Sequence, residues 1–152
     1  MNKHAGSFNP IQPQIAPTRE TITGSINLLA NCIKLKYVNF YACNVITGNI
    51  ENMFINIDRL SSVKFVYVKR VGNNEEDNWN YTTTNISGNI NVFANKYDLR
   101  EVLFYSYTNI NGQLKDLKNL KKLYYCHFRL TSVIGSKTDL YNNGAGVTHF
   151  NV

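Results

Sequence analysis

The sequence offers few side chains whose types and spacing could perform chemistry. Its three cysteines (Cys32, Cys43 and Cys126) are an odd number at no spacing typical of a metal site, so we expect free thiols in a reducing compartment. His127 directly follows Cys126, but neighbours on a strand point to opposite faces and cannot form a nucleophile–base pair. Paired carboxylates and phosphate-binding glycine loops are not evident. We therefore expect no enzyme, no metal and no cofactor.

An acidic triplet lies beside the single tryptophan of the chain. Glu75, Glu76 and Asp77 lack the ligand spacing of a calcium loop, so a calcium site is not expected. Trp79 lies within the same polar segment, and tryptophan on a loop is a typical energetic anchor of a protein contact. The sequence predicts Trp79 as a partner-binding residue.

The net charge of +6 makes nucleic acid a partner class to consider. Four lysines lie within residues 115–122, and Tyr124 is close enough to stack on a base. However, Asp98, Glu101 and Asp116 interrupt the basic surface, and arginine, the better phosphate ligand, is scarce. The pattern argues against nucleic acid and indicates a charge that maintains solubility.

Length and composition bound the class of protein. The chain has 152 residues, 43% hydrophobic and 17% charged, which is typical of one folded domain. No apolar run approaches the roughly 18 residues of a membrane helix, and the first residues lack the apolar core of a signal peptide. The excess of Asn, Ile, Lys and Tyr fits an AT-rich genome. We expect a protein without a membrane segment.

A five-residue block recurs along the chain. The pattern Ile-x-Gly-x-Ile, with Leu once as its last residue, begins at Ile22, Ile46, Ile86 and Ile110, at intervals of 24, 40 and 24 residues. A degenerate fifth copy begins at Ile134, another 24 residues on. The long interval equals one repeat plus 16 residues and predicts an insertion at residues 70–85. We expect each glycine block to form a turn.

A second pattern, Leu-x-x-φ-x-φ with φ apolar, follows each glycine block. Its last two apolar positions lie two apart, on one face of a strand. The five copies span residues 35–40, 60–65, 99–104, 120–125 and 147–152, the last with Val in place of Leu. An ordinary β-sandwich would explain the alternation but not a glycine block at a fixed period.

These two patterns together resemble the plant-type leucine-rich repeat. Residues 46–50 (Ile-Thr-Gly-Asn-Ile) stand in for its L-T-G-x-I, and Leu35, Val38 and Phe40 stand in for its L-x-x-L-x-L. The resemblance covers residues 22–152 and implies a β-rich α/β solenoid of about five units with a parallel sheet on its concave face. The chain departs from the family in uneven strand spacing, in lacking the proline after the block, and at the asparagine-ladder position. That position holds Cys43, Val68, Tyr107 and Phe128.

The concave face would display the outward residues of each strand. Tyrosine is amphipathic and loses little entropy on binding, so a tyrosine-rich face suits recognition. The alternative is that these residues form solvated cross-strand pairs. The outward set is Tyr37, Asn39, Tyr41, Ser62, Lys64, Val66, Glu101, Leu103, Tyr105, Lys122, Tyr124, Cys126, His149 and Asn151. Within it the predicted binding residues are Tyr37, Tyr41, Lys64, Leu103, Tyr105, Lys122 and Tyr124.

Residues 1–21 differ in kind from the repeats. They carry all three prolines and no repeat signature, which favours an extended arm anchored on a neighbouring subunit or another structural protein. Its predicted contact residues are Phe8, Pro10, Ile11 and Ile15. The alternative is that the arm covers its own first repeat. At the other end, Val152 lies inside an expected strand, whose open edge we expect a partner or another copy to cover. The alternative is that this last strand is frayed.

We therefore expect a non-enzymatic structural or interaction protein that forms a homo-oligomer, a dimer or trimer, inside a larger assembly. The plan of arm plus repeat domain is similar to that of head-fibre and decoration proteins of tailed bacteriophages, of which the crAss-like group fits the AT-rich composition. This resemblance implies location in the virion; otherwise the chain would be cytoplasmic. The alternative is a recognition module that binds a host-surface protein or a glycan on its concave face.

Overall fold

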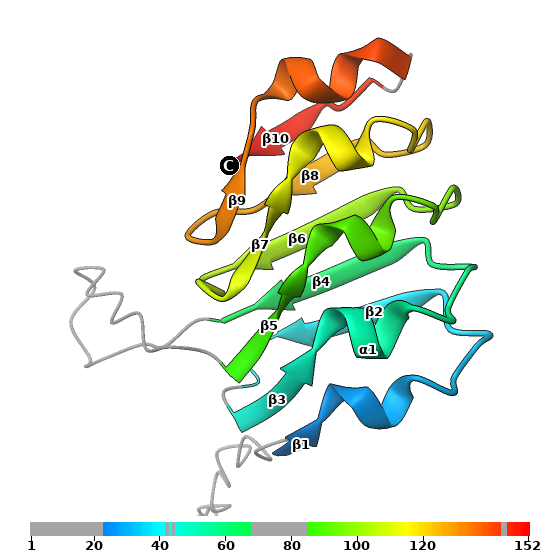
Figure 1. Ribbon diagram of the computed structural model, residues 1–152, viewed down its shortest axis with the longest axis vertical. Helices are drawn as coiled ribbons and strands as arrows, with labels where there is room; N and C mark the ends of the chain where they lie inside the picture. The colour runs from blue at the N-terminus through cyan, green and yellow to red at the C-terminus, as the bar shows by residue number, and fades with distance from the viewer. Residues whose placement is uncertain (1–22, 42, 44, 68–84, 144–145) are drawn as a thin grey trace, which may run out of the picture.

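The computed structural model describes residues 23–41, 43, 45–67, 85–143 and 146–152. There the chain makes five successive coils, each a strand, a short helix and a second strand (Figure 1). The elements of coils 1 to 5 are, in order, β1 (Thr23–Ser25), η1 (Ile26–Leu29) and β2 (Tyr37–Tyr41); β3 (Val45–Asn49), α1 (Ile50–Phe54) and β4 (Ser62–Val66); β5 (Asn85–Asn89), η2 (Ile90–Phe93) and β6 (Glu101–Tyr105); β7 (Ile110–Gln113), η3 (Leu114–Leu117) and β8 (Tyr125–His127); β9 (Ser132–Ile134), η4 (Lys137–Asn143) and β10 (His149–Asn151). The η elements are 3₁₀ helices.

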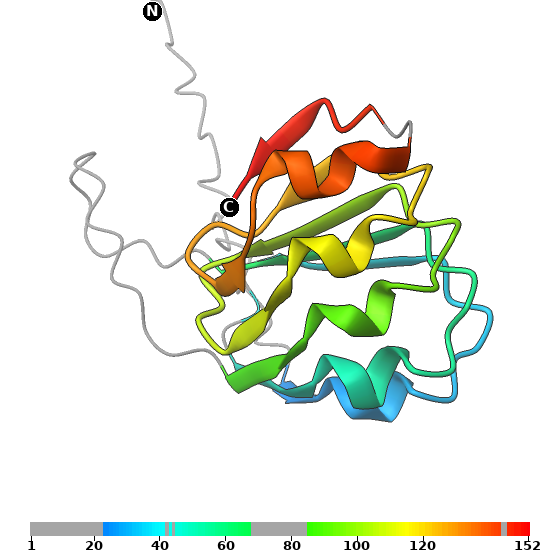
Figure 2. The same cartoon turned by 45° about the horizontal axis from the view of Figure 1, so that its top comes forward.

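Each coil adds one strand to each of two parallel sheets. The first strands form the sheet β1-β3-β5-β7-β9, here called the glycine sheet, and the second strands form β10-β8-β6-β4-β2, here called the aromatic sheet. The short helices continue from the strands of the glycine sheet and form a stack that faces the aromatic sheet (Figure 2). The expectation of a single parallel sheet was wrong. The glycine blocks, expected to be turns, are strands that pair in parallel from coil to coil.

The glycines of these blocks allow two coils to approach closely. Gly48, Gly88 and Gly112 adopt φ values of +130°, +129° and +126°, which side-chain-bearing residues rarely adopt. A Cβ atom on Gly48 would lie 2.7 Å from Cγ1 of Ile26 in the preceding coil, and one on Gly112 would lie 2.6 Å from Cγ1 of Ile90. The repeat therefore requires glycine at this position for two reasons. The backbone has a positive φ, and the preceding coil leaves no space for a side chain.

Asparagine side chains begin two of the helices. Asn49 Oδ1 accepts hydrogen bonds from the backbone N–H groups of Glu51 (2.8 Å) and Asn52 (3.1 Å), and Asn89 Oδ1 accepts one from Asn91 (2.9 Å). These bonds satisfy N–H groups that a helix start leaves without partners. Part of the asparagine richness of the chain thus reflects the recurrence of the same strand-to-helix junction.

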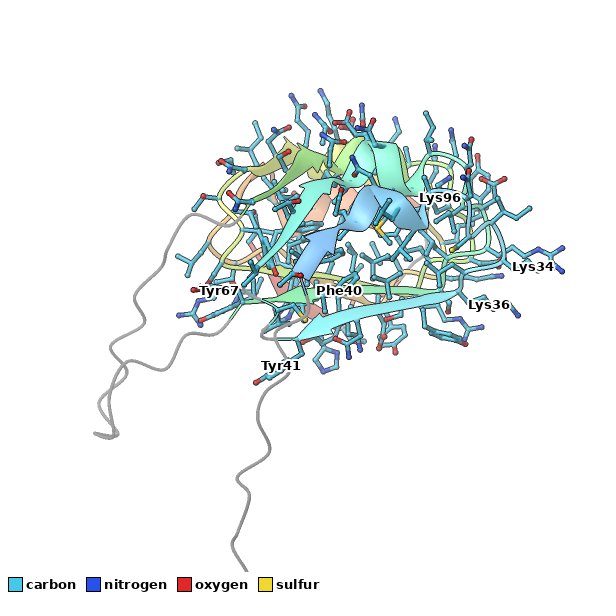
Figure 3. All side chains as sticks on the ribbon, turned by 90° about the horizontal axis from the view of Figure 1, so that it is seen from below. Lys34, Lys36, Phe40, Tyr41, Tyr67 and Lys96 are labelled. Atoms are coloured by element: carbon cyan, nitrogen blue, oxygen red, sulfur yellow. The ribbon has the colours of Figure 1, made fainter. Side chains whose placement is uncertain are left out.

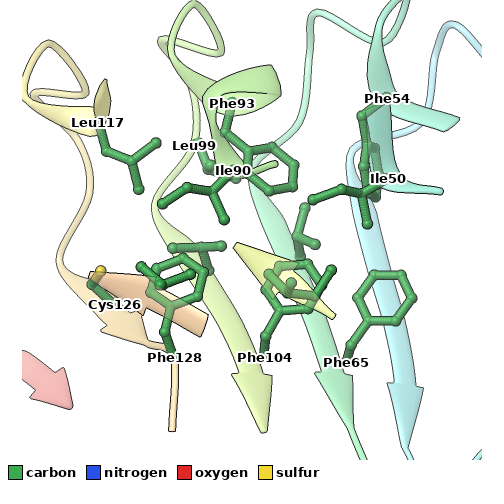
Figure 4. Packing of buried hydrophobic residues seen from close by; sticks show 14 of the residues in the cluster. Ile50, Phe54, Phe65, Ile90, Phe93, Leu99, Phe104, Leu117, Cys126 and Phe128 are labelled. Carbon is green, nitrogen blue, oxygen red and sulfur yellow. The ribbon is translucent and has the colours of Figure 1, made fainter. Parts of the chain in front are cut away.

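The core lies between the two sheets and is continuous across the coils. A row of stacked rings runs through it: Phe65 and Phe104 lie 5.0 Å apart at 7°, and Phe104 and Phe128 lie 5.9 Å apart at 8° (Figure 4). Phe40 extends this row to coil 1, with its ring centre 5.1 Å from that of Phe65. Because each ring contacts the ring of the next coil, each coil is stabilised mainly by its contacts with the coils on either side.

The structure corrects the strand expected at residues 120–125. In the aromatic sheet Cys126 pairs with Val102, so the fourth copy of the pattern is Leu123-x-x-Cys126-x-Phe128 and begins three residues later. Cys126, expected on the outward face, is fully buried in the core, and Phe128, expected at the ladder position, instead joins the row of stacked rings. The inward-facing residues of β6, β8 and β10 therefore keep the 24-residue interval, from Val102 to Cys126 to Phe150.

The fifth glycine block is also shifted. Val133, not Ile134, is the buried residue and pairs with Gly112, whereas Ile134 is 61% exposed. Gly135 then takes the glycine position with φ +127°. The fifth block therefore lies one residue closer to the fourth than the spacing of 24 predicted.

Two predicted segments lie outside the described residues. These are the N-terminal arm, residues 1–21, and the insertion at residues 70–85, of which only Asn85 is described, as the first residue of β5. Across the part of the chain that the structure describes, no helix is long and apolar enough to span a membrane.

Candidate functional site: the outward face of the aromatic sheet

The aromatic sheet carries its outward side chains in straight rows, because its parallel strands pair in register. Buried residues alternate with these outward ones along each strand. The first row is Tyr37, Ser62, Glu101, Tyr125 and His149; the second is Asn39, Lys64, Leu103, His127 and Asn151; the third is Tyr41, Val66 and Tyr105. We call this surface the outward face.

A carboxylate with three hydrogen-bond donors lies at the centre of the outward face. Glu101 Oε2 accepts hydrogen bonds from Ser62 Oγ (2.7 Å) and Lys64 Nζ (2.8 Å), and its Oε1 accepts one from the Tyr124 hydroxyl (2.7 Å). The donors come from β4 and from the residue just before β8, on either side of β6. Glu101 therefore ties three adjacent coils together at the surface.

These contacts determine the protonation state of Glu101. Partial burial alone would raise its pKa, but the hydrogen bonds from Lys64, Tyr124 and Ser62 outweigh burial and lower the pKa from 4.5 to about 2. In return, the hydrogen bond to Glu101 raises the pKa of the Tyr124 hydroxyl. The carboxylate is thus ionised at neutral pH, and its acceptor positions are already used to hold the face in shape.

An aromatic cluster adjoins this carboxylate. The ring of Tyr125 stacks on His127, with centres 4.4 Å apart, and on His149, with centres 5.3 Å apart. The Lys64 ammonium lies 5.9 Å from the Tyr125 ring centre. Burial, and to a lesser extent the nearby His149, lower the pKa of His127, so this ring is neutral at pH 7. The cluster is thus a stack of three polar rings beside one ammonium group.

The remaining tyrosines extend the face to the first coil. The Arg129 guanidinium lies 5.5 Å from the ring centre of Tyr105. Tyr37 and Tyr41 on β2 are 69% and 64% exposed. Figure 3 shows Tyr41 projecting away from the sheet, whereas Phe40 turns toward the interior. Aromatic side chains therefore occur from one end of the outward face to the other.

The structure brings together five of the seven predicted binding residues that it describes. Tyr37, Tyr41, Lys64, Leu103 and Tyr105 all lie on the outward face. Two other predicted residues, Lys122 and Tyr124, precede β8. The remaining predicted residues lie outside the described part of the chain: Phe8, Pro10, Ile11, Ile15 and Trp79.

Lys122 and Tyr124 differ in their connection to the face. Lys122 pairs with Asp98 at the surface, and both side chains are about half exposed. Tyr124 reaches the centre of the face through its bond to Glu101. The sequence analysis missed Tyr125 and His127 because it placed the fourth strand three residues too early. The interval of 24 residues from Leu99 to Leu123, equal to the interval between glycine blocks, was the signal that could have found them.

The arrangement suits binding better than proton transfer. The three bonds to Glu101 and its low pKa leave no proton to donate near neutral pH. Among the described residues, no group of three or more His, Cys, Asp and Glu side chains is arranged to hold a metal ion. What the face presents is hydroxyl groups, ring edges and two charged groups held in fixed rows, which can contact a partner surface.

Comparisons with protein-family models, curated proteins and solved structures found no match to this chain.

Proposed function

We propose that this chain is a non-enzymatic recognition module that binds a protein or a glycan on the outward face of the aromatic sheet. The observation that carries the proposal is the Glu101 network, whose hydrogen bonds join adjacent coils, beside the Tyr125 ring, which stacks on His127 of its own strand and on His149 of the next coil. A face whose polar groups are held in place before binding loses less entropy when a partner arrives.

The chemistry of the face fits such partners. Tyrosine combines a large apolar ring with a hydroxyl and has few rotatable bonds, and for this reason it is enriched in binding surfaces. Neighbouring strands lie about 4.8 Å apart, so the rows present groups at a regular spacing. Leu103 and Val66 are only partly buried between these polar residues and add apolar contact.

We further propose that the five coils form a leucine-rich-repeat-like solenoid. Support comes from the addition of one strand to each sheet per coil, and from the glycine required at one position of each block. With the corrected fourth strand, the spacing from Val102 to Cys126 and from Cys126 to Phe150 is uniform. The second parallel sheet distinguishes this arrangement from the single sheet that the resemblance implied.

Binding to defined arrays of glycans and of purified surface proteins would test the recognition proposal. The test variant is Tyr105→Ala with Tyr125→Ala, both on the outward face. The matched control is Tyr97→Ala, an equally large exposed residue in the turn between η2 and β6. We expect a ligand that binds the wild type and Tyr97→Ala but loses at least about tenfold in affinity with the double variant. A ligand bound equally by all three would place recognition elsewhere.

A second candidate function is that of an oligomeric component of a larger assembly, such as a phage virion. The observation that favours it is the end of coil 1, where, among the described residues, Cys32 is exposed although its equivalents in later coils, Lys96 and Leu120, are buried. The arm at residues 1–21 would then attach the chain to another structural protein. Peptide mass spectrometry of purified particles of a phage that encodes the chain should detect it in fixed stoichiometry, and its absence from the particles would exclude this function.

A further inference from the structure

We propose that two copies of this chain join end to end through coil 1, with β2 of one copy pairing antiparallel with β2 of the other. The two-fold axis would pass beside Asn39. This inference concerns the end of the sheets and holds whether or not the outward face binds a partner.

The two sheets end on the same coil. β1 and β2 are the terminal strands of the glycine sheet and the aromatic sheet, and both belong to coil 1 (Figure 1). An edge strand carries a row of backbone N–H and C=O groups available to another strand, and proteins usually protect such edges with charged residues or proline. β2, residues Tyr37–Tyr41, contains neither.

Coil 1 has the same glycine position against which, in coils 2 to 5, the preceding coil packs. A Cβ atom on Gly48, Gly88, Gly112 or Gly135 would meet side chains of the preceding coil, whereas one on Gly24 meets none of the described atoms within 4 Å. Gly24 nevertheless has the same backbone angle, φ +121°. The end of coil 1 is thus shaped as a stacking surface and not as a polar cap.

The turn between η1 and β2 also contains a position that the preceding coil covers in later coils. Cys32 makes the backbone bonds that Lys96 and Leu120 make in later coils: each donates to the residue three before it and accepts from the residue three after it. Lys96 and Leu120 are buried beneath the preceding coil, but Cys32 is exposed. Among the described residues, nothing therefore covers the position of coil 1 that the preceding coil covers in coils 3 and 4.

The chemistry of β2 is self-complementary about its central residue. An antiparallel pair centred on Asn39 would place Asn39 opposite its own copy, Val38 opposite Phe40, and Tyr37 opposite Tyr41. On the outward side this gives two tyrosine pairs flanking an asparagine pair, and on the inner side two apolar pairs. Aromatic and aromatic–β-branched cross-strand pairs are stabilising, and a two-fold interface requires this kind of self-complementarity.

The charged residues of coil 1 are compatible with an antiparallel pairing of β2. The described residues of coil 1 include Lys34 and Lys36 but no acidic residue. Both lysines precede β2, so in an antiparallel pair the two copies carry them at opposite ends of the interface, where they do not face each other. A parallel pairing would instead bring like charges together, which is unfavourable.

The opposite end of the sheets differs. Coil 5 ends in β10, residues His149–Asn151, which has three residues against five in β2 and so offers fewer backbone groups for pairing. Its helix, η4, is the longest 3₁₀ helix among the described residues, and Lys137, Thr138 and Asp139 lie in its first turn. We therefore assign the interface to coil 1.

The decisive experiment uses a cysteine on the proposed axis. Opposite residues of an antiparallel pair have Cα atoms about 4.5–5.5 Å apart, which lies within the disulfide range of about 4.4–6.8 Å. The test variant is Asn39→Cys, and the matched control is Asn151→Cys, in the same row at the far end of the sheet. Both carry Cys32→Ser, because Cys32 is an exposed thiol at the same end.

We expect Asn39→Cys to form a reducible covalent dimer under mild oxidation, with Asn151→Cys remaining monomeric on a non-reducing gel. Light scattering of the wild type should give twice the mass of 17.4 kDa. Asn39→Lys, which places two like charges opposite each other, should weaken self-association several-fold, while Asn151→Lys should not. Circular dichroism would verify that each variant is folded.

Three results would overturn the proposal. One is a wild type that stays monomeric at the highest concentration measured, as expected if residues 1–22 cover the end of coil 1. Another is crosslinking of Asn151→Cys in preference to Asn39→Cys, which would place the contact at coil 5. The third is a dimer that neither substitution at position 39 affects.

Discussion

Gly112 and Ile90 set the distance between two consecutive coils. A Cβ atom on Gly112 would lie 2.6 Å from Cγ1 of Ile90, closer than Cβ atoms approach other carbon atoms in proteins. The same contact recurs between Gly88 and Ile50 at 2.7 Å. The spacing of the coils therefore depends on the absence of a side chain at one position of the repeat.

Because of this contact, replacing glycine by alanine should lower the free energy of unfolding more at Gly112 than at Gly24. Gly24→Ala strains the backbone only, at about 1–3 kcal/mol, because the described atoms leave open space around Gly24. Gly112→Ala adds a collision with Ile90 and should cost roughly 1–3 kcal/mol more. Urea unfolding followed by circular dichroism would measure both free energies of unfolding. Equal losses at the two positions would show that backbone strain alone explains the glycines.

Replacing the central carboxylate of the outward face should destabilise the fold. Glu101→Gln keeps the shape of the side chain but removes the charge that Lys64, Ser62 and Tyr124 contact, and we expect a loss of about 1–3 kcal/mol in the free energy of unfolding. The control is Asp98→Asn, whose partner Lys122 forms an exposed pair that stabilises little. An equal loss in the two variants would contradict a special role for Glu101.

The pH dependence of stability gives a second test of Glu101. Its pKa is about 2 in the folded chain against an ordinary value of 4.5, so its contribution to stability is complete above pH 4.5 and disappears as pH falls toward 2. Urea unfolding between pH 7 and pH 2 should show the advantage of the wild type over Glu101→Gln shrinking across this window. A constant difference between the two proteins would contradict the low pKa.

Lys96 occupies a position that is apolar in neighbouring coils. Its side chain is 5% exposed, and Nζ donates to the carbonyl of Ile55 and to Asp58, whose side chain is 84% exposed. Lys96→Met keeps the buried stem and leaves Asp58 in water, so stability should be unchanged or rise by about 1 kcal/mol. Lys96→Ala should lose about 2 kcal/mol through the missing methylene groups.

Thermal and urea unfolding of the two Lys96 variants would separate these effects. A Met variant as unstable as the Ala variant would show that the bonds to Ile55 and Asp58, and not the stem, hold this side chain.

The three cysteines should react with iodoacetamide at different rates. Cys126 is fully buried, and burial raises its pKa from 9.0 to about 12, which reduces its thiolate fraction at pH 8 about a thousandfold. Burial also raises the pKa of Cys43, whereas Cys32 is exposed. Peptide mass spectrometry should find Cys32 modified first and Cys126 only after urea unfolding. Early modification of Cys126 would contradict the register of β8.

Much of the repeat could be predicted from the sequence, because its signals are local. A glycine with apolar residues at fixed distances on both sides constrains backbone and packing wherever it occurs, and four of the five blocks lie at the predicted residues. The strands at residues 37–41, 62–66 and 101–105 likewise follow from their alternation. The predicted tyrosine-rich face follows from the same alternation.

The fourth coil shows where local signals end. Leu114, Leu117, Leu120 and Leu123 recur every three residues, so the pattern that opens a strand fits both Leu120 and Leu123. The hydrogen bonds to the neighbouring coil, such as those from Tyr124 and Tyr125 to the carbonyl of Arg100, show that the chain uses Leu123. A shift of three residues reverses the faces of a strand, which is why Cys126 proved buried and His127 outward.

The sequence by itself thus determined the period, the glycine positions and the alternation of three strands, all of which depend on residues close together in the chain. The tertiary structure alone decided that the glycine blocks pair into a second sheet, and that Glu101 gathers donors from residues 23 to 39 positions away. Such contacts depend on how one coil lies on the next. The spacing of residues along the chain does not by itself specify how one coil lies on the next.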